Sequence, residues 1–148
     1  MANARVGSHP SHGLQVVETI TEAKQLTRSD SGKLFFVAQA GSTYVINLPE
    51  LSKDMAGFQA KFICDTIDAS VEINGYGVIA GGGTAGDNDV MRYVEIGHTE
   101  ATTADVDGIS FGGDATTVGA TIEVYTDGTY WYAYGFGAIA NDIVAVDS

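Results

Sequence analysis

The sequence predicts an all-β protein: a single-domain antiparallel β-sandwich or barrel of jelly-roll-like form, preceded by a flexible N-terminal arm. Three observations predict it. Apolar runs are short and turn residues follow each of them. Threonine, valine, isoleucine and tyrosine, which favour strands, are plentiful. No apolar pattern of helical period is long enough to form a helix that is stable alone.

The expected elements follow one another with turns between them. Residues 1–13 lack a periodic apolar pattern, so we expect a flexible arm there and a β-rich domain over residues 14–148. Single helical turns are expected at residues 21–26 and 51–56, and Pro49 should end a strand because it lacks a ladder donor. The expected strands are residues 14–20, 34–38, 43–48, 58–64, 71–74, 90–96, 109–111, 121–126 and 129–134.

The strongest local signal is a hairpin. Alternating strands flank Asp127-Gly128, a pair typical of a two-residue type I′ turn. This turn would set Val124 opposite Trp131 and Tyr125 opposite Tyr130. The hairpin would then have an apolar face suited to the core and an aromatic face with polar tips. The apolar face comprises Ile122, Val124, Trp131 and Ala133, and the aromatic face comprises Glu123, Tyr125, Tyr130, Tyr132 and Tyr134.

The aromatic face has two main interpretations, a second buried face within the monomer or an interface with another chain, and a smaller third, carbohydrate stacking. Tyrosine buries a large area at low entropic cost and keeps a hydrogen-bonding tip, so it is enriched in interfaces. The candidate interface residues are Tyr125, Tyr130, Tyr132 and Tyr134, together with Arg5 of the arm.

Charge is unevenly distributed along the 148 residues, whose net charge is −12. Residues 1–61 carry six lysines and arginines against five acidic residues, whereas residues 62–148 carry one against fourteen. An acidic body repels phosphate, so nucleic acid is not an expected partner. No apolar run of about 18 residues occurs, so we expect no membrane span. The basic-leaning N-terminal part could meet an acidic partner.

Several patterns invite a binding or redox interpretation, and we expect neither cofactor nor metal from them. Cys64 is the single cysteine and is expected to be a buried free thiol. The glycine run 81–86 lacks the Gly-Lys-Ser/Thr ending of a phosphate loop. The acidic stretches 87–89 and 105–108 lack the ligand spacing of a calcium loop. His9 and His12 have no third ligand nearby.

Two further patterns invite a catalytic interpretation. His98 with Glu100 could serve acid–base chemistry but lacks a nucleophile in a defined setting. Ser110 has the letters of a Gly-x-Ser-x-Gly motif, yet a β-strand rather than a helix is expected after it. We therefore expect a protein that is not an enzyme.

Four motifs follow one another in the chain: a turn before an aromatic strand, a strand that ends in Leu-Pro, a glycine before a phenylalanine-rich strand, and an aromatic hairpin. They are residues 26–36, 45–49, 57–63 and 127–132. This order resembles a recurring pattern in tailed-phage virion proteins and covers residues 20–136. Residues 81–89 and 97–118 have no counterpart in it.

The resemblance implies a virion surface component, a capsid decoration (cement) protein. Such proteins commonly form trimers on capsid-protein junctions, so the implied partners are the major capsid protein and further copies of this chain. The implied location is the outer capsid surface, after synthesis in the host cytoplasm. The alternative is a domain of a head or tail fibre that binds a receptor or carbohydrate, although no shaft repeat or coiled-coil heptad is present. On a capsid, the N-terminal arm would become ordered as a clamp.

Overall fold

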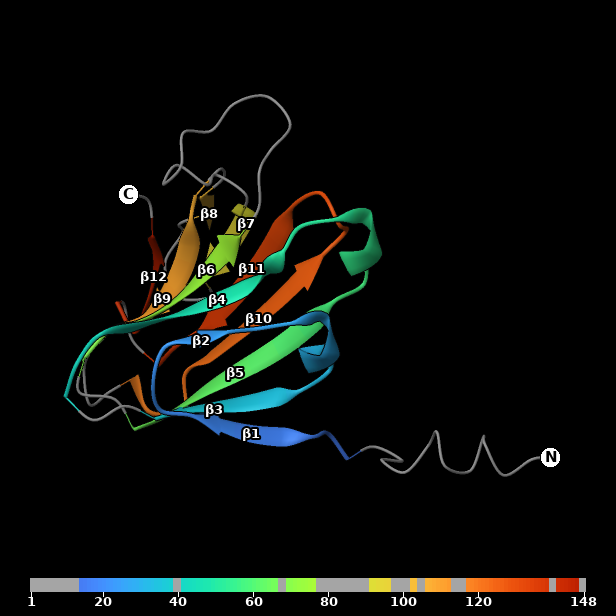
Figure 1. Cartoon of the computed structure of the whole chain (residues 1–148). Coiled ribbons are helices and arrows are strands. Elements are labelled where there is room, and N and C mark those ends of the chain that lie inside the picture. The colour runs from blue at the N-terminus through green and yellow to red at the C-terminus, as the bar shows by residue number, and fades with distance from the viewer. Residues whose placement is uncertain are drawn as a thin grey trace.

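The chain forms two β-sheets packed face to face, seen in a computed structural model that describes residues 14–38, 41–66, 69–76, 91–96, 102–103, 106–112, 117–138 and 141–146 (Figure 1). The expected all-β sandwich is confirmed, and the expected arm, residues 1–13, lies outside the described residues. One sheet has seven strands in the order β1-β3-β5-β10-β11-β7-β8, and the other has five in the order β12-β9-β6-β4-β2. The strands are β1 (Val17–Ile20), β2 (Lys24–Gln25), β3 (Leu34–Ala38), β4 (Tyr44–Glu50), β5 (Gln59–Thr66), β6 (Val71–Tyr76), β7 (Met91–Ile96), β8 (Thr102–Thr103), β9 (Gly108–Phe111), β10 (Thr121–Thr126), β11 (Trp131–Phe136) and β12 (Ile143–Val146).

Strands β1 to β6 alternate between the two sheets in chain order. In the seven-stranded sheet β1, β3 and β5 run parallel, with Leu34 beside both Val17 and Lys61. In the five-stranded sheet β2, β4 and β6 are also parallel. Same-sheet neighbours are parallel because the chain crosses to the opposite sheet and returns before it adds the next strand. The expectation of antiparallel, jelly-roll-like pairing is therefore wrong for this half of the chain.

The later strands extend both sheets, mostly by antiparallel pairing. β10 lies between β5 and β11 and is antiparallel to both. β9 lies between β6 and β12 and is antiparallel to both. β7 is parallel to β11 and antiparallel to β8. The sandwich thus combines a parallel first half with a largely antiparallel second half.

Local elements agree with the sequence except where turn chemistry was misjudged. The expected helical turn at residues 21–26 is instead a bend followed by β2, because Lys24 and Gln25 pair with Ile46 and Asn47. The turn expected at residues 51–56 is a 3₁₀ helix, Lys53–Met55. β4 continues through Pro49 to Glu50, since a register shift after Asn47 leaves the proline without a required ladder bond. Strand β12 was not predicted.

The hairpin has the expected faces but a different register. Tyr125 pairs with Tyr132 rather than Tyr130, so the loop has four residues instead of two. A type I′ turn needs positive φ at both central residues, and among the described residues Asn141 is the one non-glycine with positive φ. The Asp127 carboxylate instead accepts hydrogen bonds from the backbone N–H groups of residues 129 and 130, at 2.8 and 2.9 Å.

The register shift preserves which side chains point inward. A shift of two residues leaves strand parity unchanged, because side chains alternate with a period of two. Trp131 lies beside Thr126 rather than Val124, yet it is fully buried as expected. At the loop Gly128 has φ of 90°, and a side chain there would meet the carbonyl oxygen of Ser52 at 2.7 Å.

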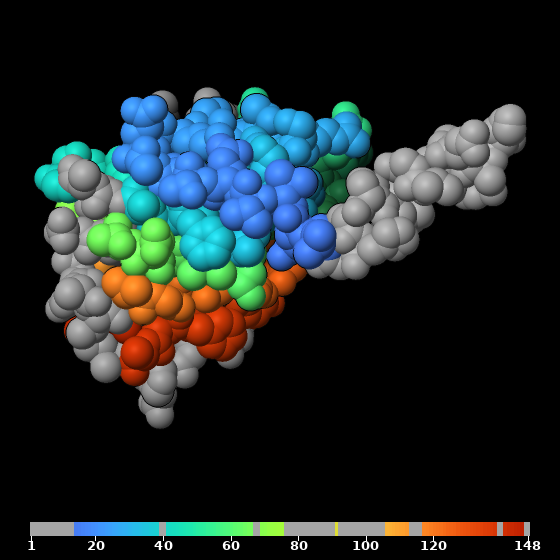
Figure 2. Space-filling model, turned by 90° about the horizontal axis from the view of Figure 1, so that it is seen from below, coloured from blue at the N-terminus to red at the C-terminus, as the bar shows by residue number. Residues whose placement is uncertain are grey.

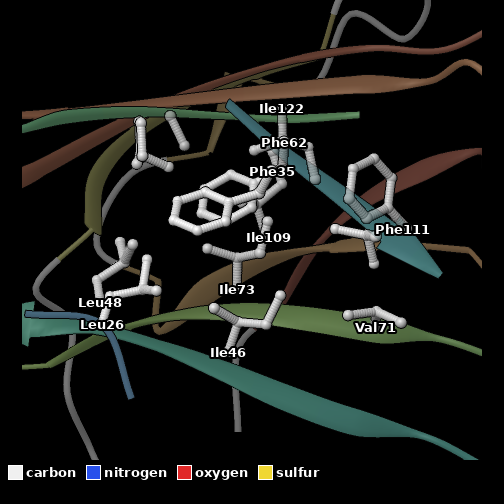
Figure 3. Packing of buried hydrophobic residues seen from close by; sticks show 14 of the residues in the cluster. Leu26, Phe35, Ile46, Leu48, Phe62, Val71, Ile73, Ile109, Phe111 and Ile122 are labelled. Carbon is white, nitrogen blue, oxygen red and sulfur yellow. The ribbon is translucent and has the colours of Figure 1, made fainter. Parts of the chain in front are cut away.

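The core is a single cluster between the sheets, shown in Figure 3. Phe35 and Phe62 stack at 5.2 Å between ring centroids, on the inner side of the seven-stranded sheet. Phe58 meets Trp131 edge to face at 5.5 Å. Cys64 is buried as expected, and burial raises the pKa of its thiol to about 11. The facing residues of the five-stranded sheet include Ile46, Leu48, Val71, Ile73, Ile109 and Phe111.

Replacing Trp131 by alanine should destabilise the domain strongly. Its side chain is fully buried and contacts Phe58, so the substitution leaves a large cavity. The expected loss is about 3–5 kcal/mol of unfolding free energy, measured by urea denaturation. Tyr132→Ala, one residue along on the outer face, is the matched control and should cost much less. Equal losses would show that the two faces of β11 are buried alike.

Candidate interaction surface

The aromatic face of the hairpin is on the outside of the seven-stranded sheet. Figure 2 views this side, where the colours run from blue at β1 through cyan, green and orange to red at β11. Tyr125 is 38% exposed, and Tyr132 and Tyr134 are half-buried. We name Glu123, Tyr125, Tyr132 and Tyr134 the tyrosine face. No described part of the chain forms a layer over it, so among the described residues the tyrosine face is not a second internal core.

The tyrosine face continues across β5 in rows set by strand pairing. Gln59, Tyr125 and Tyr132 form one row. Lys61, Glu123 and Tyr134 form the next. The third row is Ile63, Thr121 and Phe136, and Phe136 is 55% exposed. Aromatic, aliphatic and polar side chains therefore alternate over three central strands, a composition found in protein interfaces.

Charged groups in the middle row are paired. Lys61 Nζ lies 2.9 Å from Glu123 Oε1, and the hydroxyl of Tyr125 donates to Glu123 Oε2 at 2.7 Å. These two contacts hold the pKa of Glu123 below its usual value against the opposing effect of burial, and the contact with Lys61 has the larger effect. The same hydrogen bond raises the pKa of Tyr125. The Tyr125 and Tyr134 rings pack edge to face at 5.9 Å, so the face is held in one arrangement.

The hairpin loop fixes one end of the tyrosine face. The Tyr132 hydroxyl donates to Asp127 Oδ2 at 3.1 Å. The Asp127 carboxylate also accepts the backbone N–H of Tyr130, which is the main cause that lowers its pKa. Thr126 Oγ1 donates to the Tyr130 carbonyl at 2.7 Å. One carboxylate therefore orders both the loop backbone and the position of a tyrosine ring.

A shallow hollow of about 120 Å³ lies beside Tyr125. Its lining mixes an aromatic ring with amide and charged groups from β5, β10 and the segments that precede β1 and β3. The lining residues are Gln15, Gly32, Lys33, Gln59, Ala60, Lys61, Glu123 and Tyr125. A ring flanked by hydrogen-bonding side chains can stack on and bind a flat polar ligand such as a sugar.

The structure brings together three of the five candidate interface residues. Tyr125, Tyr132 and Tyr134 share the face, whereas Tyr130 lies in the loop, because that loop is longer than predicted. Arg5 lies outside the described residues. Phe136 was missed, although the alternation that places Tyr132 and Tyr134 outward extends to it. The contribution of β5 was missed because strand order was not known.

The other residues weighed for chemistry are not arranged for it within the part of the chain that is described. Ser110 is buried in the middle of β9, where its hydroxyl donates to the Phe111 carbonyl at 3.3 Å, so the strand-to-helix elbow of a hydrolase is absent at that point. Asp107 is buried. No group of three or more possible metal ligands occurs in the described ranges. His9, His12, His98, Glu100, Asp105 and residues 81–89 lie outside them.

Comparisons with known proteins do not place the chain in a family. No family model, curated protein or solved structure matches it. Among the described residues, no helix has the length and apolar character needed to cross a membrane. The case for function therefore rests on the geometry of the sheet and its exposed side chains.

Glu123→Gln should lower the pKa of Tyr125 toward its ordinary value. The anionic carboxylate accepts a hydrogen bond from the phenol and opposes formation of a second negative charge on it. The amide of glutamine carries no charge and does not oppose it. Tyrosine-selective NMR titration would follow the Tyr125 ring in both proteins. Glu72→Gln, on the other sheet, is the control and should leave that pKa unchanged. An unaltered Tyr125 titration in Glu123→Gln would contradict this pairing.

Proposed function

We propose that this chain is a non-enzymatic structural protein that binds other protein chains through the outer face of its seven-stranded sheet. The observation that carries the proposal is the tyrosine face, which lies at the surface with its ring positions fixed by hydrogen bonds. A preorganised aromatic surface loses little side-chain entropy when a partner covers it. Because Lys61 is paired with Glu123, a partner that covered this face would bury no unpaired charge at that pair.

The partner we propose is the major capsid protein of a tailed phage, with the chain acting as a capsid decoration protein on the outer head surface. The order of turn and strand motifs over residues 20–136, which resembles virion proteins, supports this choice. The mechanism would be added contact area across the seams between capsid subunits, which opposes the internal pressure of packed DNA. The excess of acidic residues after residue 61 disfavours direct contact with that DNA.

Self-association is part of this proposal. Decoration proteins commonly form trimers, and a trimer of this chain would offer three tyrosine faces to one capsid junction. Several weak contacts made together hold far more tightly than one, because the later contacts form within a single assembly. The chain would be made in the host cytoplasm and reside on the virion.

A second candidate is a fibre domain that binds a carbohydrate. The hollow beside Tyr125 favours it, since Gln59 and Glu123 could hydrogen-bond to sugar hydroxyls while the ring stacks on the sugar. Binding of the purified chain to a glycan array, lost in Tyr125→Ala, would support this candidate. Retention of the chain on DNA-filled heads after tails are removed would support the decoration proposal, and its loss with the tails would contradict it.

Tyr132→Ala should leave the domain folded and weaken its attachment to phage heads. Tyr132 is half-buried in the free chain, so its removal costs little core packing but takes a ring from the centre of the face. Co-sedimentation of the purified variant with undecorated heads would measure the affinity, and a loss of tenfold or more is expected for a central interface aromatic. Val144→Ala, at an exposed position on the five-stranded sheet, is the control. Attachment of Tyr132→Ala equal to that of the control would contradict the proposed face.

A further inference from the structure

A second exposed apolar region lies at the β1 edge of the seven-stranded sheet, separated from β10 and its tyrosine-face residues by β3 and β5. Leu14 is 77% exposed, Val16 is 64% exposed and Val17, the first residue of β1, is 56% exposed. Four other large apolar side chains among the described residues are exposed: Tyr125 and Phe136 at or next to the tyrosine face, and Val118 and Val144 elsewhere. Three such residues within four positions form an unusual cluster on a protein surface.

Strand β1 also differs from two of the other three sheet edges, β2 and β8. Edge strands are normally protected by shortness, charge or covering groups. β2 and β8 have two residues each. At β2 the Gln25 side chain further donates to the carbonyls of Leu26 and Leu48. β1 has four residues, as has β12, the remaining edge strand. Residues 14–16, which precede β1, add two exposed apolar side chains and contain neither lysine nor proline.

The backbone of β1 presents unused hydrogen-bonding groups at this edge. The N–H of Leu34 bonds to the carbonyl of Val16 at 2.9 Å, so the Val16 carbonyl points toward β3. Successive residues of a strand direct their backbone groups to opposite sides. Val17 and Thr19 therefore direct their N–H and C=O groups away from β3, toward the open side of the sheet.

The strand is held firmly enough to act as a template. The Tyr44 hydroxyl donates to the Ile20 carbonyl at 3.1 Å, which fixes one end of β1 from the opposite sheet. The Glu18 carboxylate is bonded to both Lys24 and Lys33, and these bonds lower its pKa. The one charge on β1 is thus neutralised within the chain. A partner strand would meet an apolar edge with no uncompensated charge.

Hollows flank β1 at both ends. One of about 380 Å³ lies at its start and is lined by Leu14, Gln15, Val16, Ser29, Ser31, Gly32 and Lys33. Another of about 220 Å³ lies at its end and is lined by residues 18–24. A partner strand that paired along the whole of β1 would place side chains over both hollows.

We propose that β1 pairs antiparallel with β1 of a second copy of this chain, about a two-fold axis at Val17. This register pairs Gln15 with Thr19, so the outward backbone groups meet each other. It sets exposed Leu14 opposite buried Ile20, and Glu18 opposite Val16, so no like charges face across the axis. A two-fold contact requires such a self-complementary strip, and residues 14–20 provide one.

The pairing joins two seven-stranded sheets into one and leaves the tyrosine face free. It does not rest on the proposed capsid contact, because it uses the backbone edge of β1 rather than the tyrosine face. Alone it gives a dimer. In combination with a trimer it links neighbouring trimers, an arrangement suited to covering a lattice.

A disulfide engineered at the axis tests the pairing directly. In Val17→Cys the two Cα atoms would be about 5.5 Å apart, the spacing of a hydrogen-bonded antiparallel pair and within the range a disulfide spans. Mild oxidation should convert most of the protein to a reducible dimer, and the native Cys64 does not interfere because it is buried. Thr19→Cys, on the same face of the same strand, and Val118→Cys, 54% exposed elsewhere, are the controls and should remain uncrosslinked.

A proline variant tests the pairing in solution without oxidation. The Val17 N–H points away from β3, so Val17→Pro keeps the intrachain ladder and removes a donor to the partner. Its mass by light scattering at micromolar concentration should fall to half that of the native chain or less, with its β-sheet circular dichroism retained. Val118→Ala should keep the native mass. A monomeric native chain, or no excess of crosslinking in Val17→Cys over both controls, would overturn the proposal.

Discussion

Burial of alternate residues between two sheets is the constraint on which the rest of this structure depends. Every strand of the first half must place one face in the shared core, and the chain meets this demand by crossing from sheet to sheet. Phe35 and Phe62, two strands apart in the chain, stack because β3 and β5 are parallel neighbours. Because side chains alternate along a strand, the neighbours of each inward residue point to the outer face of the sheet. The surface is therefore a consequence of the core.

The outer face shows this consequence most clearly. β10 is inserted between β5 and β11, and because Ile122 and Val124 point inward, Glu123 and Tyr125 lie outside beside Lys61 and Tyr132. Hydrogen bonds and ring packing then order side chains that would otherwise move freely. At the edge of the same sheet, β1 is anchored by Tyr44 and by paired charges, yet its outer backbone groups remain open. A face and an edge of one sheet thus offer two different ways of contacting other chains.

Sequence reasoning predicted what depends on local periodicity. The bounds of β3, the 3₁₀ turn before Gly57 and the inward position of Trp131 follow from alternation and turn residues. It did not predict the parallel pairing, because strands that alternate between sheets have the same local pattern as hairpin strands. It placed Tyr130 on the aromatic face because it assumed a two-residue Asp-Gly turn. The loop has four residues instead, and its backbone N–H groups bond to the Asp127 carboxylate. Lys61 and Gln59 joined the candidate surface only once the order of strands was known.

The central claim is that the tyrosine face is the side of the sandwich that contacts the capsid. Electron cryo-microscopy of phage heads bearing this chain tests it most directly. The account predicts density for the sandwich on the outer head surface, with β10 and β11 against the capsid protein and Tyr125 and Tyr132 at the contact. A sandwich whose five-stranded sheet faces the capsid while the tyrosine face meets solvent, or heads that lack the chain, would contradict the account.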